Sequence, residues 1–267
     1  MIRVMVCGAY GKMGREVLKA VNSDPELSLV GAMDIKSDFA DAGSLIGVDK
    51  IGVIVGNDLQ TVINETKPQV MVEFTAPDSV MPNIRLAMKN GVSPVIGTTG
   101  LVAADVKEIE ELCKQYCISA LIAPNFSVGA ILMMLFAAEA AKYLPNVEII
   151  ELHHDQKLDA PSGTALRTAE LIVANRGEKK QGHPDEVEKL VGARGADYAG
   201  IRMHSVRLPG YVAHQEVIFG GVGQTLTIRH DSISRESFMP GVVLACKRVL
   251  SLDGLVHGLE HLLITKQ

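Results

Sequence analysis

In the first half of the chain, short apolar runs alternate with stretches whose apolar residues recur at helical spacing. The apolar runs predict strands at residues 2–7, 27–33, 52–55, 70–74, 94–96 and 118–122. The stretches between them predict helices at residues 12–23, 59–66, 79–90 and 102–116. Strands that alternate with helices are typical of a parallel sheet with helices on both faces. The pattern therefore predicts an α/β fold whose N-terminal part is a Rossmann-like parallel sheet.

From about residue 125 the pattern changes. Long helices are predicted at residues 128–143 and 164–175, with a strand at 147–153 between them. Residues 176–200 are polar and contain glycine, which predicts a mobile loop. Strands at 201–207, 212–219 and 225–229 are spaced as an antiparallel meander, and helices follow at 240–250 and 255–263. We expect a second, α+β domain of mixed or antiparallel sheet at residues 125–235, and a first domain made of residues 1–124 and 236–267.

The composition limits the classes of function. With 267 residues, of which 47% are hydrophobic, the chain can form one large domain or two modest ones. The formal net charge of −5 gives no overall attraction for nucleic acid. The N-terminus runs directly into a strand pattern without a signal peptide, and the apolar run at 128–138 is too short to span a bilayer. We therefore expect a cytoplasmic protein with no membrane or nucleic-acid partner.

A glycine-rich segment lies between the first predicted strand and the first predicted helix. Glycines there allow a tight turn and let the backbone approach a pyrophosphate at the helix N-terminus. The spacing is GxxGxxG rather than GxGxxG, so the position of the segment carries more weight than its pattern. A glycine turn beside a surface aspartate is the alternative. We interpret the segment and the acidic residue after the second strand as a dinucleotide site formed by Gly8, Ala9, Tyr10, Gly11, Lys12, Met13, Gly14 and Asp34.

The acidic residue also bears on the choice of cofactor. Asp34 favours NAD, because its carboxylate would repel the 2′-phosphate of NADP, although Lys36 could offset that repulsion. NADH or NADPH is therefore expected, with NAD favoured and dual use left open. Three later loops follow strands of the same predicted sheet, and ligands of such sheets bind at the carboxyl ends of the strands. These loops add Phe74, Thr75, Gly97, Thr98, Thr99, Ala123, Pro124, Asn125 and Phe126 to the expected cofactor site.

A second group of polar residues lies between residues 151 and 165. Ser162 is a good N-cap for the helix that follows, whose first backbone N–H groups can bind a carboxylate or phosphate. Two histidines and a lysine just upstream can supply protons or positive charge. A capped surface helix is the alternative for any one of these residues, but their concentration in so short a segment favours an anion site. The site would comprise His153, His154, Lys157, Ser162, Gly163 and Thr164.

No metal site is expected. His153 and His154 are adjacent in a predicted strand, so their side chains face opposite sides and cannot chelate one ion together. The cysteines show neither a CxxC pair nor a zinc spacing, which predicts reduced thiols. They are Cys7, Cys113, Cys117 and Cys246.

The sequence resembles the 4-hydroxy-tetrahydrodipicolinate reductase (dihydrodipicolinate reductase) family, from residue 2 to about residue 250. The motifs that carry the resemblance are GAYGKMG, EFTAP, GTTG, APNFSVG, ELHHDQKLDAPSGTA, MHSVRLPGYVAHQEVIFGG and TIRHDSISRESFMPG. The segment ELHHDQKLDAPSGTA is specific, whereas many dehydrogenases share the glycine loop. The resemblance implies that a cyclic, unsaturated dicarboxylate is reduced by NADH or NADPH in lysine and diaminopimelate biosynthesis.

The resemblance also implies roles for particular residues. His153 would be the general acid/base and Lys157 a proton donor, and the substrate carboxylates would be held by His154, Ser162, Gly163 and Thr164. Hydride would pass from the nicotinamide to ring carbon C4. The first domain would bind the dinucleotide, and the second would bind substrate and build a homotetramer. Two alternatives are another nicotinamide enzyme, such as a diaminopimelate or homoserine dehydrogenase, and a dinucleotide sensor without catalysis.

Overall fold

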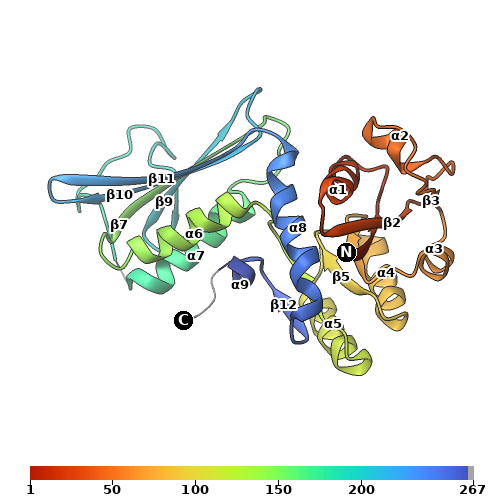
Figure 1. The fold of residues 1–267 in the computed structure, drawn as a ribbon. Helices are drawn as coiled ribbons and strands as arrows, with labels where there is room; N and C mark the ends of the chain where they lie inside the picture. Colours follow the sequence, from red (N-terminus) through yellow and green to blue (C-terminus); the bar gives the residue numbers. More distant parts are fainter. Residues whose placement is uncertain (178, 264–267) are drawn as a thin grey trace. The chain divides into compact units, whose positions relative to one another are not determined.

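The computed structural model describes residues 1–177 and 179–263. The chain divides into two compact units, each with its own β-sheet (Figure 1). Unit 1 comprises Met1–Ser127 and the C-terminal segment from Phe238, and unit 2 comprises Val128–Ser237. The domain boundaries expected from the sequence, at 124/125 and 235/236, lie a few residues N-terminal to the boundaries between the two units of the structure. Residues 264–267 of the expected first domain and residue 178 of the expected second lie outside the described residues.

Unit 1 is built on a seven-stranded sheet whose described strands all pair in parallel. Across the sheet, the strand order is β12, β6, β5, β4, β1, β2, β3. The strands are β1 (Ile2–Cys7), β2 (Leu27–Met33), β3 (Val55–Gly56), β4 (Val70–Glu73), β5 (Ser93–Ile96), β6 (Ala120–Ile122) and β12 (Leu255–His257). A parallel sheet with helical crossovers confirms the predicted Rossmann-like α/β fold.

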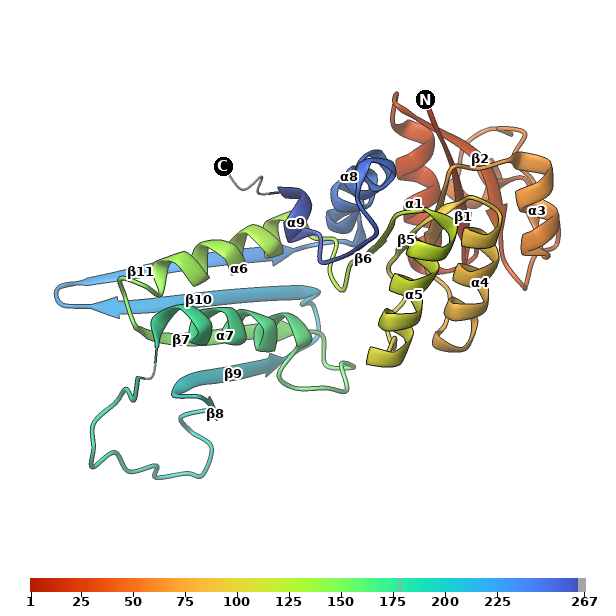
Figure 2. The ribbon, with the colours of Figure 1, turned by 90° about the horizontal axis from the view of Figure 1, so that it is seen from below.

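The helices of unit 1 form two layers. Helices α3, α4 and α5 contact one another in series, whereas α1 contacts α8 (Figure 2). The helices are α1 (Lys12–Ser23), α2 (Ala42–Ile46), α3 (Leu59–Thr66), α4 (Pro77–Lys89), α5 (Ala103–Tyr116), α8 (Met239–Arg248) and α9 (Glu260–Leu263), with a short 3-10 turn at Val249–Ser251. A second 3-10 turn, Arg235–Phe238, spans the boundary between the two units. Helices on both faces explain why β1 is buried along most of its length.

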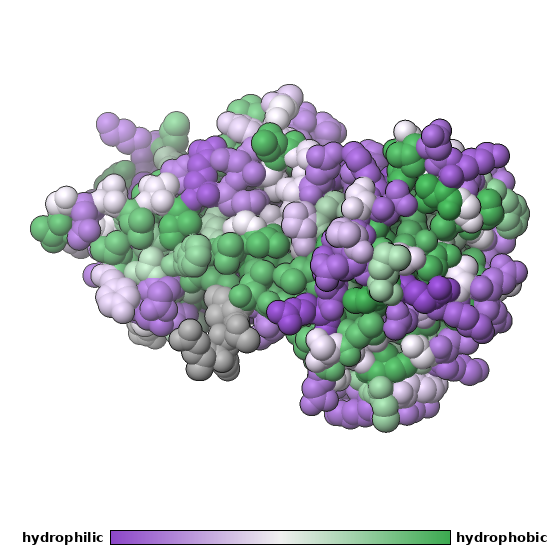
Figure 3. All heavy atoms as spheres, viewed as in Figure 1, coloured by the Kyte–Doolittle hydropathy of each residue, from purple (hydrophilic) through white to green (hydrophobic). Residues whose placement is uncertain are grey.

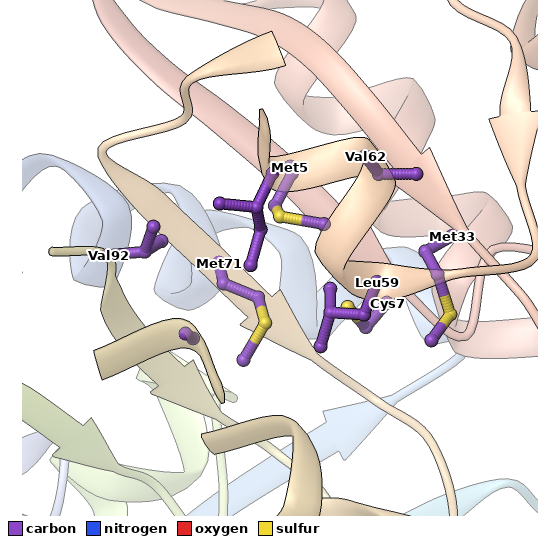
Figure 4. Close-up of a cluster of buried hydrophobic side chains, with 9 residues drawn as sticks. Met5, Cys7, Met33, Leu59, Val62, Met71 and Val92 are labelled. Carbon is purple, nitrogen blue, oxygen red and sulfur yellow. The ribbon is translucent and has the colours of Figure 1, made fainter. Parts of the chain in front are cut away.

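One hydrophobic cluster in unit 1 joins the central strands to α3. Side chains from β1, β2, β4 and α3 meet there (Figure 4), and each is at most 6% exposed. Three of them are the methionines Met5, Met33 and Met71, whose flexible side chains fill irregular gaps between sheet and helix. The cluster fixes the strands whose carboxyl ends carry the loops of the expected cofactor site.

Unit 2 is a five-stranded mixed sheet covered on one face by two helices (Figures 1 and 2). Its elements are α6 (Val128–Ala140), β7 (Asn146–His153), α7 (Gly163–Arg176), β8 (Ala196–Tyr198), β9 (Ile201–Arg207), β10 (Ala213–Gly221) and β11 (Gln224–Ser232). Alternate side chains of β7 and β10, including Val147, Ile149 and Phe219, are buried on the helix-covered face. The second, α+β domain of mixed sheet is therefore confirmed.

The predicted antiparallel meander is wrong in its first step. β10 and β11 form the expected hairpin, but β9 pairs in parallel with β7 and antiparallel with β8. The order in the sheet is β11, β10, β7, β9, β8, so β7 separates two strands that are neighbours in the sequence. Spacing along the chain cannot reveal this arrangement, because it depends on pairing with a strand some fifty residues upstream.

Two other predictions need correction, and one short helix was missed. Residues 255–257 form β12 rather than the start of a helix, because Gly254 and Gly258 both adopt positive φ and isolate a short apolar run. The end of the predicted loop at 176–200 is strand β8, which pairs with β9. Helix α2 was not predicted; it is too short for periodicity and is capped by the carboxylate of Asp41, which accepts from Gly43 N at 2.8 Å.

None of the helices in the described part of the chain has the length and apolar character needed to cross a bilayer. On the face of unit 2 seen in Figure 3, hydrophobic residues gather over α6, and Phe136 of that helix is 55% exposed. Such an exposed aromatic side chain is ordinary unless it belongs to a large apolar patch.

Candidate active site

In the turn from β1 into α1, two positions, Gly8 and Gly14, have no space for a Cβ atom. Gly8 adopts φ +84°, and a Cβ there would lie 2.3 Å from the carbonyl oxygen of Phe74. A Cβ on Gly14 would lie 2.0 Å from the carbonyl oxygen of Gly8. Gly11 is the N-cap of α1 and has no side chain with which to cap the helix. The first backbone N–H groups of α1 are thus suited to an anion such as a pyrophosphate.

Asp34 follows β2 and is held against this turn. Its carboxylate accepts hydrogen bonds from Tyr10 N at 2.9 Å and from Lys36 N at 3.0 Å. The Asp34 side chain is only 9% exposed, whereas Lys36 is exposed. The Tyr10 hydroxyl donates to Asp38 on the next loop. The geometry places a carboxylate beside the glycine turn, where it can accept hydrogen bonds from a ribose.

Buried Glu73, at the end of β4, joins two of the expected cofactor loops. Its carboxylate accepts from Thr75 N at 3.0 Å, from the Thr75 hydroxyl, and from Asn83 Nδ2 at 3.1 Å. Thr75 N also donates to the hydroxyl of Thr98 at 2.9 Å. Burial raises the pKa of Glu73, and the hydrogen bonds from Thr75 and Asn83 only partly oppose that rise. Sequence reasoning missed Glu73, although a carboxylate inside the apolar run of β4 was a visible signal.

The remaining expected cofactor residues follow β5 and β6. Phe126 is 2% exposed and its ring centroid lies 5.6 Å from that of Phe74. Ala123 N donates to Ile96 O at 3.0 Å, and the Asn125 side chain accepts from Ser127 N at 2.8 Å. Because the carboxyl ends of parallel strands lie at one edge, the structure brings the loops after β1, β2, β4, β5 and β6 to that edge.

In unit 2, His153 ends β7 beside a buried ion pair. Its Nδ1 lies 2.5 Å from Glu151 Oε2, and Arg207 approaches both Glu151 oxygens, at 2.7 and 2.9 Å. His153 and Arg207 are register partners on β7 and β9, on the face that the helices cover. Burial alone would raise the pKa of Glu151, but hydrogen bonds from His153 and Arg207 lower it to about 2. Glu151 is therefore a stable anion next to Nδ1 of His153.

The segment after His153 leads to the N-terminus of α7. Lys157 N donates to His154 O at 3.2 Å, and Lys157 Nζ lies 2.7 Å from the carboxylate of Asp159. Arg207 Nη2 donates to Asp159 O at 2.9 Å, which ties this segment to the ion pair on the sheet. The structure thus ties the segment that carries Lys157 to the end of the sheet at which His153 lies.

The start of α7 has the features predicted for an anion site. The hydroxyl of Ser162, which is 3% exposed, accepts from Ala165 N at 3.2 Å. Gly163 is exposed, and a Cβ added to it would meet no atom within 4 Å. Open space at a helix N-terminus leaves room for a ligand carboxylate.

The two groups of candidate residues belong to different units. The residues expected to bind the dinucleotide lie in unit 1, and the His, Lys and Ser residues lie in unit 2. Sequence reasoning missed Glu151 and Arg207 as partners of His153, because Arg207 lies 56 residues away in the sequence. Within the described residues, no three His, Cys, Asp or Glu side chains gather as metal ligands would.

Two family models match this chain, and each one covers approximately one of the two units. Residues 2–126 match the family model described as dihydrodipicolinate reductase, N-terminus, and residues 129–263 match that of its C-terminus. The chain is 55% identical, over 263 residues, to the 4-hydroxy-tetrahydrodipicolinate reductase of Desulfitobacterium hafniense, covering 98% of both chains. It is 55% identical over 262 residues to that of Moorella thermoacetica, again covering 98% of both.

Solved structures agree with these matches. The dipicolinate-bound dihydrodipicolinate reductase from Paenisporosarcina sp. TG-14 superposes with a TM-score of 0.87 at 46% identity, covering 97% of this chain and 98% of that one. An amine dehydrogenase from Mycobacterium smegmatis superposes with a TM-score of 0.68 at 16% identity, covering 97% and 95% of the two chains. The second likeness concerns the fold alone.

The glycine turn gives a direct prediction for Gly14→Ala. The new Cβ would collide with the carbonyl of Gly8, so the turn must open and the first N–H groups of α1 must move. We expect NADH affinity to fall by roughly tenfold or more, since charge-assisted hydrogen bonds at a helix start depend on their geometry. Fluorescence titration would measure it, with Gly220→Ala, where a Cβ meets nothing within 4 Å, as the control. An unchanged affinity in Gly14→Ala would contradict this role of the turn.

Proposed function

This chain belongs to the dihydrodipicolinate reductase family, and from that premise we propose that it reduces 4-hydroxy-tetrahydrodipicolinate (dihydrodipicolinate) to tetrahydrodipicolinate with NADH or NADPH. The reaction is a step of lysine and diaminopimelate biosynthesis. The observation that supports the proposal is the set of hydrogen bonds by which Glu151 and Arg207 join His153 to the segment that carries Lys157 and leads to the start of α7. An acid–base pair beside an anion site suits reduction of a dicarboxylate.

The dinucleotide would be held by the carboxyl edge of the unit 1 sheet. The residues present fit such a group, because Gly8, Gly11 and Gly14 form a turn that leaves the start of α1 open to a pyrophosphate. Bound there, NADH or NADPH supplies the hydride for the reduction. The proposed contacts are those predicted from sequence: Gly8, Ala9, Tyr10, Gly11, Lys12, Met13, Gly14, Asp34, Phe74, Thr75, Gly97, Thr98, Thr99, Ala123, Pro124, Asn125 and Phe126.

The preference between the two dinucleotides is proposed to favour NADH. The carboxylate of Asp34 would accept hydrogen bonds from ribose hydroxyls and repel a 2′-phosphate. Lys36, exposed two residues later, can reduce that repulsion, so NADPH is proposed as a second, weaker cofactor.

The substrate is proposed to be a small dicarboxylate held in unit 2. One solved relative, at 46% identity, is named as dipicolinate-bound, and dipicolinate is a planar dicarboxylate. The backbone N–H groups of Ser162, Gly163 and Thr164, with the hydroxyls of Ser162 and Thr164, would bind one carboxylate at the start of α7. His154, exposed on the preceding segment, would bind the other. Positive charge and N–H donors are what such an anion requires.

His153 and Lys157 would manage protons and charge. As hydride arrives, negative charge develops on the substrate, and a nearby acid or cation stabilises it. His153 Nδ1 lies 2.5 Å from the Glu151 carboxylate, which leaves Nε2 as the nitrogen that can exchange a proton with the substrate. The ammonium of Lys157 is directed by Asp159, 2.7 Å away, and its side chain is 20% exposed. His153 would thus act as general acid/base and Lys157 as proton donor.

We also propose that the chain forms a homotetramer through unit 2. The helices α6 and α7 cover only one face of its sheet (Figures 1 and 2). On the other face, Ile150, Leu152, Val206 and Ile218 remain partly exposed. A second copy could cover these apolar side chains. The cytoplasm is the proposed compartment, supported by the buried thiols of Cys7, Cys113 and Cys246.

A coupled assay tests the proposed reaction. Aspartate semialdehyde and pyruvate are condensed by the preceding synthase, and NADH or NADPH oxidation is followed with and without this protein. We expect rapid, synthase-dependent oxidation, and a fall in kcat of about 10²-fold or more in His153→Ala and Lys157→Ala with NADH binding unchanged. The exposed His183→Ala and Lys107→Ala serve as matched controls. Absence of oxidation with either cofactor would reject the reaction, and near-normal rates in both variants would reject the residue roles.

The role of Asp34 gives a second prediction. Asp34→Ala removes the proposed ribose contact and also the repulsion of a 2′-phosphate. We therefore expect NADH affinity to fall more than NADPH affinity, so that the ratio of the two dissociation constants shifts toward NADPH. Titration of both dinucleotides would measure the shift, with the exposed Asp253→Ala as the control. Equal losses for the two dinucleotides would mean that Asp34 does not contact the ribose.

A further inference from the structure

The geometry points to Glu151 and Arg207 as positioning residues for proton transfer. We infer that this buried pair fixes the tautomer and orientation of His153 and ties to it the segment that carries Lys157. The inference rests on the proposed function, because it assigns the origin of the proton chemistry at the same site. Neither Glu151 nor Arg207 is proposed to touch the substrate.

The first support is the burial of the carboxylate. Glu151 is 1% exposed, and it lies on the face of β7 that the helices cover. A carboxylate withdrawn from water costs several kcal/mol unless cations and donors replace the solvent. Arg207 meets this need with two hydrogen bonds, at 2.7 and 2.9 Å, in the bidentate geometry that suits a carboxylate. The pair therefore holds the Glu151 carboxylate as an anion in a fixed orientation.

The second support is the contact with the histidine. Glu151 Oε2 lies 2.5 Å from His153 Nδ1. A carboxylate anion can only accept hydrogen bonds, so Nδ1 must carry the proton. The other ring nitrogen, Nε2, is then the one that gives and takes a proton while Nδ1 keeps its own. A histidine used as general acid/base needs this fixed assignment, since the wrong tautomer presents the wrong nitrogen.

The third support is the second contact of Arg207. Besides Glu151, its guanidinium donates to the carbonyl of Asp159 at 2.9 Å, and the Asp159 carboxylate lies 2.7 Å from Lys157 Nζ. One arginine therefore links the anion beneath His153 to the backbone of the segment that positions Lys157. Leu208 N, next to Arg207, donates to His153 O at 3.1 Å and reinforces the link.

The strand neighbours of Glu151 carry no charge, so its negative charge is balanced by Arg207 and His153. On β9 its register partner is Ser205, and on β10 it is Gln215, and both are uncharged. Gln215 instead donates to Thr168 of α7 at 2.7 Å. The titratable groups of the adjoining segment are His154, Asp155, Lys157 and Asp159. Removing the negative charge of Glu151 would thus leave Arg207 without its carboxylate and His153 without its anion.

The test is Glu151→Gln, which keeps the shape and removes the charge. The amide can donate to Nδ1, so the ring would no longer be held with its proton there. We expect kcat in the coupled assay to fall roughly tenfold or more, with a smaller change in KM for the dicarboxylate and unchanged NADH affinity. The pH profile of kcat should change as well, because the charged group beside the ring that exchanges the proton is gone. Arg207→Lys, which keeps the charge, should lose only part of the rate.

The matched control is Glu108→Gln in unit 1. Glu108 also accepts two hydrogen bonds from one arginine, Arg85, at 2.5 and 2.8 Å, but on exposed helices. Its kcat and pH profile should equal those of the unmodified protein. A Glu151→Gln protein that is folded and retains the original kcat and pH profile would overturn the inference, because a merely structural pair changes stability and leaves both unaltered.

A measurement on the unmodified protein keeps the inference testable if Glu151→Gln fails to fold. Nitrogen-15 NMR of the histidine rings, with His153 assigned by comparison with His153→Ala, reports which nitrogen carries the proton in the neutral ring. We expect the proton on Nδ1; a proton on Nε2 would overturn the inference. This readout does not need turnover. If the unmodified protein fails to oxidise either cofactor, the proposed function fails, while the tautomer still decides the positioning role.

Discussion

A carboxylate can leave water only where cations or hydrogen-bond donors replace its hydration, and each unit of this protein buries such a group beside its candidate site. In unit 1, Glu73 has neutral donors alone, from Thr75 and Asn83, and burial raises its pKa. In unit 2, Glu151 has Arg207 and His153, and after the cost of burial its pKa falls to about 2. The need to replace lost hydration therefore has two outcomes. Glu73 holds two loops of unit 1 together through hydrogen bonds, whereas Glu151 is a permanent anion in unit 2.

The two arrangements suit different tasks. The turn and loops of unit 1 offer backbone N–H groups and a carboxylate at the edge of a parallel sheet, which is chemistry for binding a dinucleotide. The end of β7 and the start of α7 in unit 2 offer titratable side chains and an open helix N-terminus, which is chemistry suited to protons and carboxylates. The chain belongs to the dihydrodipicolinate reductase family, and both tasks serve the reaction of that family. Reduction of a cyclic dicarboxylate needs a hydride source and a proton source.

Much of this could be predicted from the sequence, because the decisive signals are local. The glycine turn lies between a strand and a helix, and the segment from His153 to Thr164 is continuous in the chain. What escaped prediction depends on distant pairing. β9 inserts beside β7 rather than β10, and that step brings Arg207 to Glu151 across 56 residues of sequence. The short strand β12 escaped for a different reason, since spacing cannot distinguish so short an apolar run from a helix.

The most direct test of the central claim is to follow a hydrogen from cofactor to product. The synthase-generated substrate would be reduced in ordinary water with NADH deuterated at the transferable position of C4, and the product analysed by mass spectrometry and NMR. We expect tetrahydrodipicolinate that carries the cofactor deuterium at ring carbon C4. A product without the cofactor deuterium at C4, or cofactor oxidation without any reduced dicarboxylate, would contradict it.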